Sequence, residues 1–346
     1  MRNSNIVFLI ALKHNETEVQ KGSFMALDPE IDVIIKAAFA AGGRSICTMP
    51  VPEARAAYRE RYRMRGPAHI DLPRVHDFTV ASDPGSLTCR LYVPKTPSSA
   101  PLLPLILYFH GGGFVVGDIE AYDLQSRLLA KETGALVLVP DYRLAPEHPF
   151  PAALEDAETI LEWVFGNAAS LDADPARIVV AGDSAGGNLA AHCTRLARAR
   201  SLPLAGQALF YPVTDFTTYA GGARYPSVEA FSSGYFLDRV MMEWFMDLYL
   251  PERPLARDLR ASPILAPDFE GQAPALIVTA GFDPLRDMGH AYAERLSQAG
   301  VAVRTLCFDT LIHNFLGMIG GVEAAAKAFH GIVEDLRGRL LKPGPG

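Results

Sequence analysis

The chain has 346 residues, of which 49% are hydrophobic and 21% are charged, and 32 Lys and Arg against 39 Asp and Glu give a formal net charge of −7. A chain of this length can bury a large apolar core, and its four cysteines lie far apart without a C-x-x-C pair, which argues against a disulfide framework or a zinc site. The acidic balance and the lack of a basic run argue against a nucleic-acid partner.

The N-terminal segment carries a short apolar run at residues 6–12, preceded by Arg2. The run is at the lower limit for a signal peptide, and residues 13–16 (Lys-His-Asn-Glu) replace the small residues of a cleavage site. It is also too short to span a bilayer. We therefore expect residues 1–24 to be an extension ahead of Met25, and the protein to be cytoplasmic without a membrane span; secretion is the alternative.

Buried strands and helix-length amphipathic segments alternate along the rest of the chain. A first helix is predicted from Asp28-Pro29 to a stop at Gly42-Gly43. Short apolar runs predict strands at residues 87–93, 105–109, 135–139, 178–181, 208–211, 275–279 and 301–308. Apolar residues at helical spacing predict helices at residues 53–64, 122–132, 152–165, 188–200, 238–249, 287–298 and 322–340.

This alternation predicts an α/β fold with a mostly parallel central sheet that helices cover on both faces. Residues 216–266 break the rhythm, since they are rich in Tyr, Phe, Met and Pro. We expect them to form a helical cap with the N-terminal helices. The predicted division is an extension at 1–24, cap segments at 25–75 and 216–266, and core segments at 76–215 and 267–346.

A candidate nucleophile lies between a strand and a helix, in Gly182-Asp183-Ser184-Ala185-Gly186. A G-x-S-x-G motif in this context predicts a sharp turn that exposes the serine hydroxyl at its tip. The flanking glycines suit a tight turn with strained backbone. Ser184 is therefore the predicted nucleophile.

A second glycine-rich turn, His110-Gly111-Gly112-Gly113-Phe114, follows the strand at 105–109. Such a turn can direct backbone N–H groups at the oxyanion of an acyl-transfer intermediate, and the N–H of Ala185 would be a further donor. A phosphate-binding loop is disfavoured because no Lys-Ser/Thr pair follows. His110 is interpreted as bracing this loop.

A serine nucleophile needs a base and an orienting acid, both at the carboxyl edge of the sheet. His313 follows the strand at 301–308, whereas His192, His290 and His330 lie within predicted helices. Asp283 follows the strand at 275–279, and its competitor Asp287 lies where a helix N-cap is expected. The chain order Ser184, Asp283, His313 is that of the α/β-hydrolase fold.

Together these motifs resemble the hormone-sensitive lipase family of α/β-hydrolase esterases, in its bacterial branch with a GDSAG-type elbow. The matching motifs follow the family's order, at residues 110–114, 141–147, 182–187, 283–287 and 313–315. The resemblance implies that Gly112, Gly113 and Ala185 form the oxyanion hole. It also implies frequent dimerisation through the edge strand, here residues 301–308. Thr310 and Asn314 stand where family members often have glycine.

The expected activity is hydrolysis of carboxylic esters through an acyl-enzyme, without a metal or organic cofactor. The resemblance implies short- to medium-chain acyl groups and a small-molecule ester substrate. An amidase, lactonase or carbamate hydrolase would use the same residues, and a lipase would prefer long chains. A non-catalytic receptor-like protein is a further alternative, although such relatives typically lose the histidine. Arg143 is interpreted as structural, and Met241, Met242, Trp244 and Phe245 as cap packing or pocket lining.

Overall fold

A computed structural model describes residues 26–42, 44–63, 70–83, 85–94, 102–222 and 224–342 of the chain. The predicted extension at residues 1–24 lies outside these described residues. Among the described residues, no helix is both long and apolar enough to cross a membrane.

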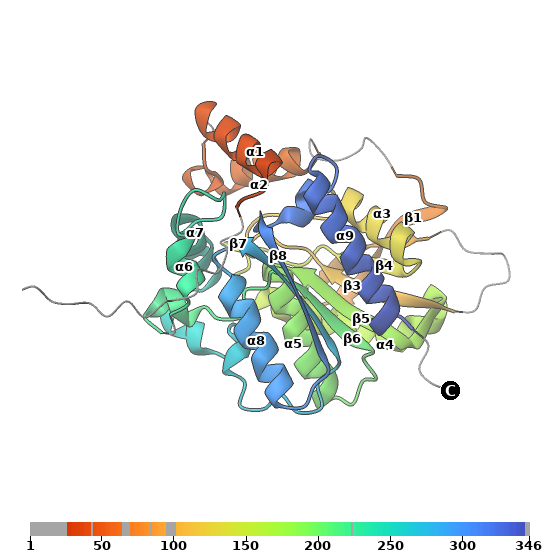
Figure 1. Cartoon of the computed structure of the whole chain (residues 1–346). Helices are drawn as coiled ribbons and strands as arrows, with labels where there is room; N and C mark the ends of the chain where they lie inside the picture. Colours follow the sequence, from red (N-terminus) through yellow and green to blue (C-terminus); the bar gives the residue numbers. More distant parts are fainter. Residues whose placement is uncertain are drawn as a thin grey trace, which may run out of the picture.

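One eight-stranded sheet forms the centre of the molecule, in the order β1-β2-β4-β3-β5-β6-β7-β8 (Figure 1). The strands are β1 (Arg74–Ser82), β2 (Gly85–Val93), β3 (Leu103–Phe109), β4 (Leu136–Pro140), β5 (Ala173–Asp183), β6 (Gly206–Phe210), β7 (Ala275–Phe282) and β8 (Val303–Ile312). The strand β2 pairs antiparallel with both β1 and β4, whereas β3 through β8 run parallel to one another. The α/β fold expected from the alternating pattern is confirmed.

Helices cover both faces of this sheet, as they must where parallel strands are buried on both sides. The helices are α1 (Pro29–Ala40), α2 (Val51–Arg63), α3 (Asp123–Thr133), α4 (Ala152–Asn167), α5 (Ala185–Ala199), α6 (Pro226–Ala230), α7 (Arg239–Tyr249), α8 (Arg286–Gln298) and α9 (Glu323–Asp335). Short single turns lie at Ile46–Thr48, Ala168–Leu171, Thr217–Ala220, Arg253–Arg257, Pro263–Leu265, Phe315–Met318 and Leu336–Leu340.

The strand β3 illustrates how the sequence produces two apolar layers. Its side chains alternate in direction: Leu105 and Leu107 pack in one buried cluster together with residues of α4, α5 and α8. Ile106 and Tyr108 pack in the other cluster, which contains residues of α3 and α9. A continuous apolar run is therefore required of a central strand, and this explains why the strands were recognisable in the sequence.

Two strands at the edges of the sheet differ from the sequence-based expectation. The strand β1 was not predicted, because it lies at the sheet edge and Val80 is its only buried residue, so it lacks an apolar run. The strand β8 continues to Ile312 rather than ending at Phe308, because its polar residues Asp309 and Thr310 are tolerated on an exposed edge. The histidine at 313 thus follows its strand directly.

The segments predicted as cap lie at one end of the molecule. Figure 1 shows α1 and α2 in red beside α6 and α7 in teal. Asp28 starts α1 as a helix N-cap, since its carboxylate accepts from the N–H groups of Glu30 (2.9 Å) and Ile31 (3.2 Å). Asp238 caps α7 in the same way through the N–H of Met241. The helices α1, α2 and α7 border a pocket at the carboxyl edge of the sheet.

Candidate active site

Ser184 lies on the sharp turn between β5 and α5, and its backbone has φ 53° and ψ −115°. This region is strained for a residue with a side chain. The turn is also tightly packed, since a Cβ on Gly186 would lie 1.9 Å from the carbonyl oxygen of Phe109, and one on Gly182 would lie 2.3 Å from the oxygen of Gly186. Glycine is therefore required at both flanking positions. The helix begins at Ala185, three residues earlier than predicted.

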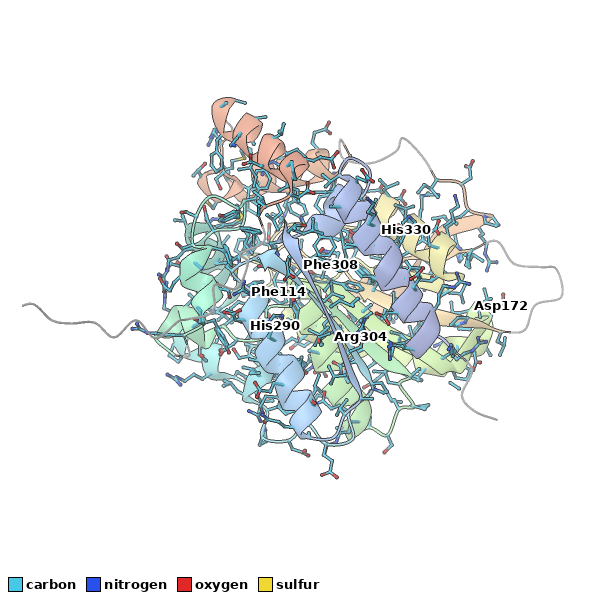
Figure 2. All side chains as sticks on the ribbon, viewed as in Figure 1. Phe114, Asp172, His290, Arg304, Phe308 and His330 are labelled. Carbon is cyan, nitrogen blue, oxygen red and sulfur yellow. The ribbon has the colours of Figure 1, made fainter. Side chains whose placement is uncertain are left out.

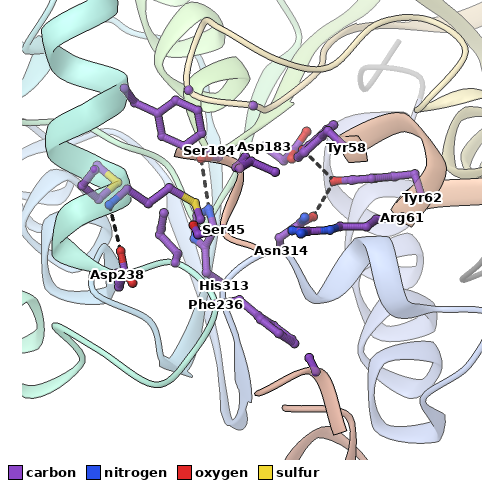
Figure 3. A pocket seen from close by; sticks show the side chains of 18 of the residues that line it. Ser45, Tyr58, Arg61, Tyr62, Asp183, Ser184, Phe236, Asp238, His313 and Asn314 are labelled. Carbon is purple, nitrogen blue, oxygen red and sulfur yellow. Dashed lines mark hydrogen bonds between the residues drawn. The ribbon is translucent and has the colours of Figure 1, made fainter. Parts of the chain in front are cut away.

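The structure brings Ser184, His313 and Asp283 into one hydrogen-bonded path. Figure 3 shows its first contact, between Ser184 and His313. The Nε2 atom of His313 lies 3.0 Å from the Oγ of Ser184, and its Nδ1 lies 2.8 Å from the Oδ2 of Asp283. Asp283 is fully buried and His313 is 8% exposed. The three residues follow β5, β7 and β8, whose carboxyl ends meet at one edge of the sheet.

This geometry fixes the tautomer of the neutral imidazole. The second oxygen of Asp283 accepts the N–H of Leu285 at 2.8 Å, which holds the carboxylate in place. A carboxylate can only accept, so the proton of the neutral ring lies on Nδ1 and leaves Nε2 free to accept from the Ser184 hydroxyl. The arrangement can therefore move a proton from the serine to the histidine.

The glycine-rich turn lies against the same cavity, since Gly112 and Gly113 line it with Ser184 and His313. Both glycines have positive φ angles, 118° and 61°. A Cβ on Gly112 would lie 2.0 Å from the oxygen of Val116, and one on Gly113 would lie 2.2 Å from the Phe245 ring. Side chains are therefore excluded here, and the backbone can approach a substrate closely.

Asp287, the competing acid, has other partners in the structure. Its Oδ2 accepts the N–H of Ser227 at 2.8 Å, and its Oδ1 pairs with Arg286 at 2.8 Å. It lies in the first turn of α8 rather than at the N-cap position expected from the sequence. These contacts tie α8 to the short helix α6.

The other histidines named above make other contacts in the structure. His110 is buried, with its ring stacked on Tyr142 (centroids 4.3 Å apart) and its Nδ1 2.8 Å from the oxygen of Gly111. His192 bonds Glu158 at 2.8 Å. His290 bonds Thr279 at 2.9 Å, and burial lowers its pKa. Figure 2 shows His290 on α8 and His330 on α9.

Two arginines fasten the loop that follows β4. Arg143 bonds Asp156 at 3.0 Å and Glu155 at 3.1 Å, in agreement with its structural interpretation. Arg55 reaches across from α2 and donates to the oxygens of Val115 (2.8 Å) and Ala145 (2.9 Å). It also pairs with Glu147, whose pKa it lowers. The N-terminal helices are thus anchored to the glycine-rich turn.

A cavity of about 450 Å³ opens above Ser184. Much of its apolar lining comes from α1, α7 and the segment before α7, including Ile34, Phe39, Phe236, Leu237, Met241, Met242 and Phe245. Trp244 packs on Phe245, with ring centroids 5.1 Å apart. The N-terminal helices were expected in the cap, but the residues of α1 that line the cavity were not identified, because helical periodicity does not show which distant surface a given face covers. Among the described residues, no group of three or more His, Cys, Asp or Glu could hold a metal ion.

A family model described as the alpha/beta hydrolase fold matches residues 106–317, more than half of the chain. The chain belongs to this family. Its resemblance to the bacterial hormone-sensitive lipase branch is also borne out by esterase relatives. Carboxylic ester hydrolase LipN of Mycobacterium tuberculosis is 40% identical over 289 residues, which cover 81% of this chain and 73% of LipN. Ethyl acetate hydrolase of Pseudomonas putida is 34% identical, over 91% of this chain and all of that protein.

Solved structures of this α/β-hydrolase family are similar throughout the fold. The ester hydrolase EH1AB1 from the metagenome of Lake Arreo superposes with a TM-score of 0.85 at 37% identity, covering 90% of this chain and 98% of that one. The thermostable carboxylesterase EstE1, from a metagenomic library, superposes with a TM-score of 0.80 at 38% identity. The match covers 86% of this chain and 99% of EstE1. The motifs that follow the family's order along the sequence therefore meet around Ser184 in the structure.

Asn314 marks a departure from the glycine that this family often has after the base. Its backbone lies in the left-handed region, with φ 62° and ψ 31°. Glycine is favoured there because it has no Cβ, and asparagine is among the side chains that tolerate the region best. The backbone of the loop therefore suits both residues. The side-chain oxygen of Asn314 also accepts a hydrogen bond from Tyr62, which glycine could not do.

Proposed function

We propose that the chain is a serine carboxylesterase in which Ser184 is the nucleophile, His313 the general base and Asp283 the orienting acid. The observation that carries this proposal is the hydrogen-bonded path from Ser184 through His313 to Asp283, which begins in an open pocket and ends in the core. Carboxylic ester hydrolysis itself agrees with the names of the relatives.

In the proposed reaction, the Ser184 hydroxyl attacks the ester carbonyl while His313 takes its proton. The backbone N–H groups of Gly112, Gly113 and Ala185 stabilise the oxyanion of the tetrahedral intermediate. His313 then protonates the departing alcohol, which leaves an acyl-enzyme. Water, deprotonated by His313, releases the acid and restores Ser184, while Asp283 stabilises the imidazolium during each transfer.

A fluorophosphonate probe tests the nucleophile directly, because it phosphonylates only a serine that a neighbouring base activates. We expect mass spectrometry of the labelled protein to find one adduct, on the peptide that contains Ser184. Absence of any adduct would favour the receptor-like alternative, and an adduct on another residue would overturn the assignment.

We propose esters of short- to medium-chain acids as substrates, because the cavity of about 450 Å³ is lined by apolar side chains of α1 and α7. Each buried methylene is worth about 0.8 kcal/mol, so kcat/KM is expected to rise by up to about fourfold per added carbon while the chain fits. A series of aryl esters from acetyl to palmitoyl measures this. A steady rise to the longest chains, with preference for emulsified triglyceride, would indicate a lipase instead.

The same catalytic groups would attack amides, lactones or carbamates, so a panel of matched substrates complements the ester series. We expect the aryl ester to have the highest kcat/KM of the panel, because its leaving group needs the least help from His313. A higher value for an amide, lactone or carbamate of equal acyl size would replace the esterase proposal with that activity.

We also propose that residues 25–75 and 216–266 form the cap over the core segments 76–215 and 267–346. Support comes from the pocket, which the described parts of both cap segments line together. Arg55 attaches the first segment to the loop after β4, and Phe245 attaches the second to Gly113. Limited proteolysis with and without a bound phosphonate checks this division, since we expect the phosphonate to protect sites in both cap segments. Protection of only one would contradict it.

The partner proposed for the edge of the sheet is a second copy of the chain, paired through β8. This strand is last in the sheet order, and edge strands present backbone groups that another strand can pair. Sedimentation should then give about twice the chain mass of 37.5 kDa; a monomer at all concentrations would contradict it.

A cytoplasmic location is also proposed, in agreement with the free thiols of Cys47, Cys89, Cys193 and Cys307. Cell fractionation checks the location, and recovery outside the cytoplasm would contradict it.

A further inference from the structure

Three tyrosine hydroxyls form a triangle beside the candidate active site. The oxygens of Tyr58 and Tyr62 are 3.1 Å apart, those of Tyr62 and Tyr122 are 2.9 Å apart, and those of Tyr58 and Tyr122 are 3.1 Å apart. Tyr58 and Tyr62 belong to α2, one turn apart, whereas Tyr122 immediately precedes α3. The group therefore joins the N-terminal helices to the core.

Each bond from this triangle to the active site ends on the neighbour of a proposed functional residue. Tyr62 donates to the Oδ1 of Asn314 at 2.7 Å, and Asn314 follows His313 (Figure 3). Tyr122 donates to the Oδ2 of Asp183 at 2.9 Å, and Asp183 precedes Ser184. The N–H of Gly111, which precedes Gly112, lies 3.1 Å from the Tyr122 hydroxyl and 2.9 Å from Asp183.

The number of hydroxyl protons determines what Tyr62 can do. The Tyr62 hydroxyl has one proton and two acceptors within reach, the Asn314 Oδ1 at 2.7 Å and the Tyr122 hydroxyl at 2.9 Å. The amide oxygen can only accept, whereas the Tyr122 hydroxyl can accept from Tyr58 instead. We therefore assign the proton of Tyr62 to Asn314. Burial raises the pKa of Tyr62 well above its ordinary value, so the hydroxyl stays protonated and remains a donor. Tyr62 is 7% exposed, and water is therefore a poor substitute partner for this bond.

The surroundings leave Asn314 little freedom to move away. Its left-handed backbone is one that few residues adopt. Gly317 lies beside the contact, where an added Cβ would be 3.2 Å from both the Asn314 Oδ1 and the Tyr62 ring. The ring of Tyr62 and the loop after His313 thus pack closely, with the hydrogen bond between them.

From this juxtaposition we infer that Tyr62 is a positioning residue: its hydroxyl, bonded to Asn314, fixes the loop that holds the His313 imidazole between Ser184 and Asp283. The inference rests on the proposed function of His313. It assigns a role in the reaction to the N-terminal helix α2, which contributes no group to the proton transfer. It also explains the use of asparagine at a position that glycine would satisfy for the backbone alone.

The test is a double-mutant cycle with Tyr62→Phe and Asn314→Gly, since each removes one side of the bond and glycine keeps the left-handed backbone. We expect each variant to lower kcat for a short aryl ester by about tenfold, with KM changed by less than about twofold. Together they should lower kcat by no more than either alone. The rate of Ser184 phosphonylation should fall in parallel, because it depends on His313 but not on deacylation.

Tyr58→Phe is the matched control, because it removes a hydroxyl of the same triangle and leaves the Tyr62–Asn314 bond in place. We expect a smaller loss of kcat than for Tyr62→Phe. In the double variant with Asn314→Gly, the fold-losses of the two single variants should multiply. Losses from Tyr62→Phe and Asn314→Gly that multiply, or a lowered Tm with unchanged kcat, would overturn the positioning role. If Tyr62→Phe does not fold, Asn314→Gly carries the same test through kcat and phosphonylation. Failure of the wild-type protein to phosphonylate would instead overturn the proposed function.

Discussion

Replacing Ser184 by alanine is expected to lower kcat for an aryl ester by about 10⁴ to 10⁶. The substitution removes the Oγ atom that lies 3.0 Å from His313, and no acyl-enzyme can then form. The oxyanion donors and the pocket would remain, so a small residual rate over water is expected. Steady-state kinetics with pure protein, with mass spectrometry to exclude wild-type carry-over, measures the effect.

The fold should survive this change, since alanine keeps the Cβ and meets the same backbone strain as serine at φ 53°. A Tm close to that of the wild type would confirm this. Activity within tenfold of the wild type would mean that another side chain attacks the ester, and the assignment of Ser184 would then be wrong.

Replacing Asp283 by asparagine is expected to lower kcat by about 10⁴. The side chain keeps its size, but its NH₂ group can take the place of the oxygen that now accepts from Nδ1 of His313. The imidazole would then carry its proton on Nε2, where it can no longer accept from Ser184. The KM should change less than kcat, because Asp283 is fully buried and does not reach the substrate.

Asp287→Asn is the matched control, four residues further along the chain. It weakens the contacts to Ser227 and Arg286, so we expect a lower Tm with kcat within about tenfold of the wild type. If Asp287→Asn reduced kcat more than Asp283→Asn does, the orienting acid would have to be reassigned.

Most strands of the core could be predicted from the sequence, because central strands are buried on both faces and so appear as continuous apolar runs, as in β3 and β7. The edge strand β1 does not satisfy this condition, and its residues could not be recognised in the same way. Ser184, Asp283 and His313 were recognisable because each follows a predicted strand directly or within a few residues. Such positions converge at one edge of a parallel sheet.

The tyrosine triangle could not be predicted in this way, because Tyr62 and Asn314 are separated by 252 residues. Tyrosines at the spacing of Tyr58 and Tyr62 on a helix suggest only that one face is apolar, and they do not identify the loop against which it packs. One signal was present in the sequence, namely the asparagine where glycine was expected after His313. Its partner required the structure, since the contact depends on how the cap lies on the core.

The backbone at Ser184 restricts how this enzyme can change during evolution. Threonine carries a hydroxyl too, but its branched Cβ is strongly disfavoured at φ 53°. Cysteine, which has an unbranched Cβ, meets only the backbone strain that serine already has. A single substitution at this position can therefore keep a nucleophile only if the new side chain has an unbranched Cβ, and a threonine enzyme would require a different turn.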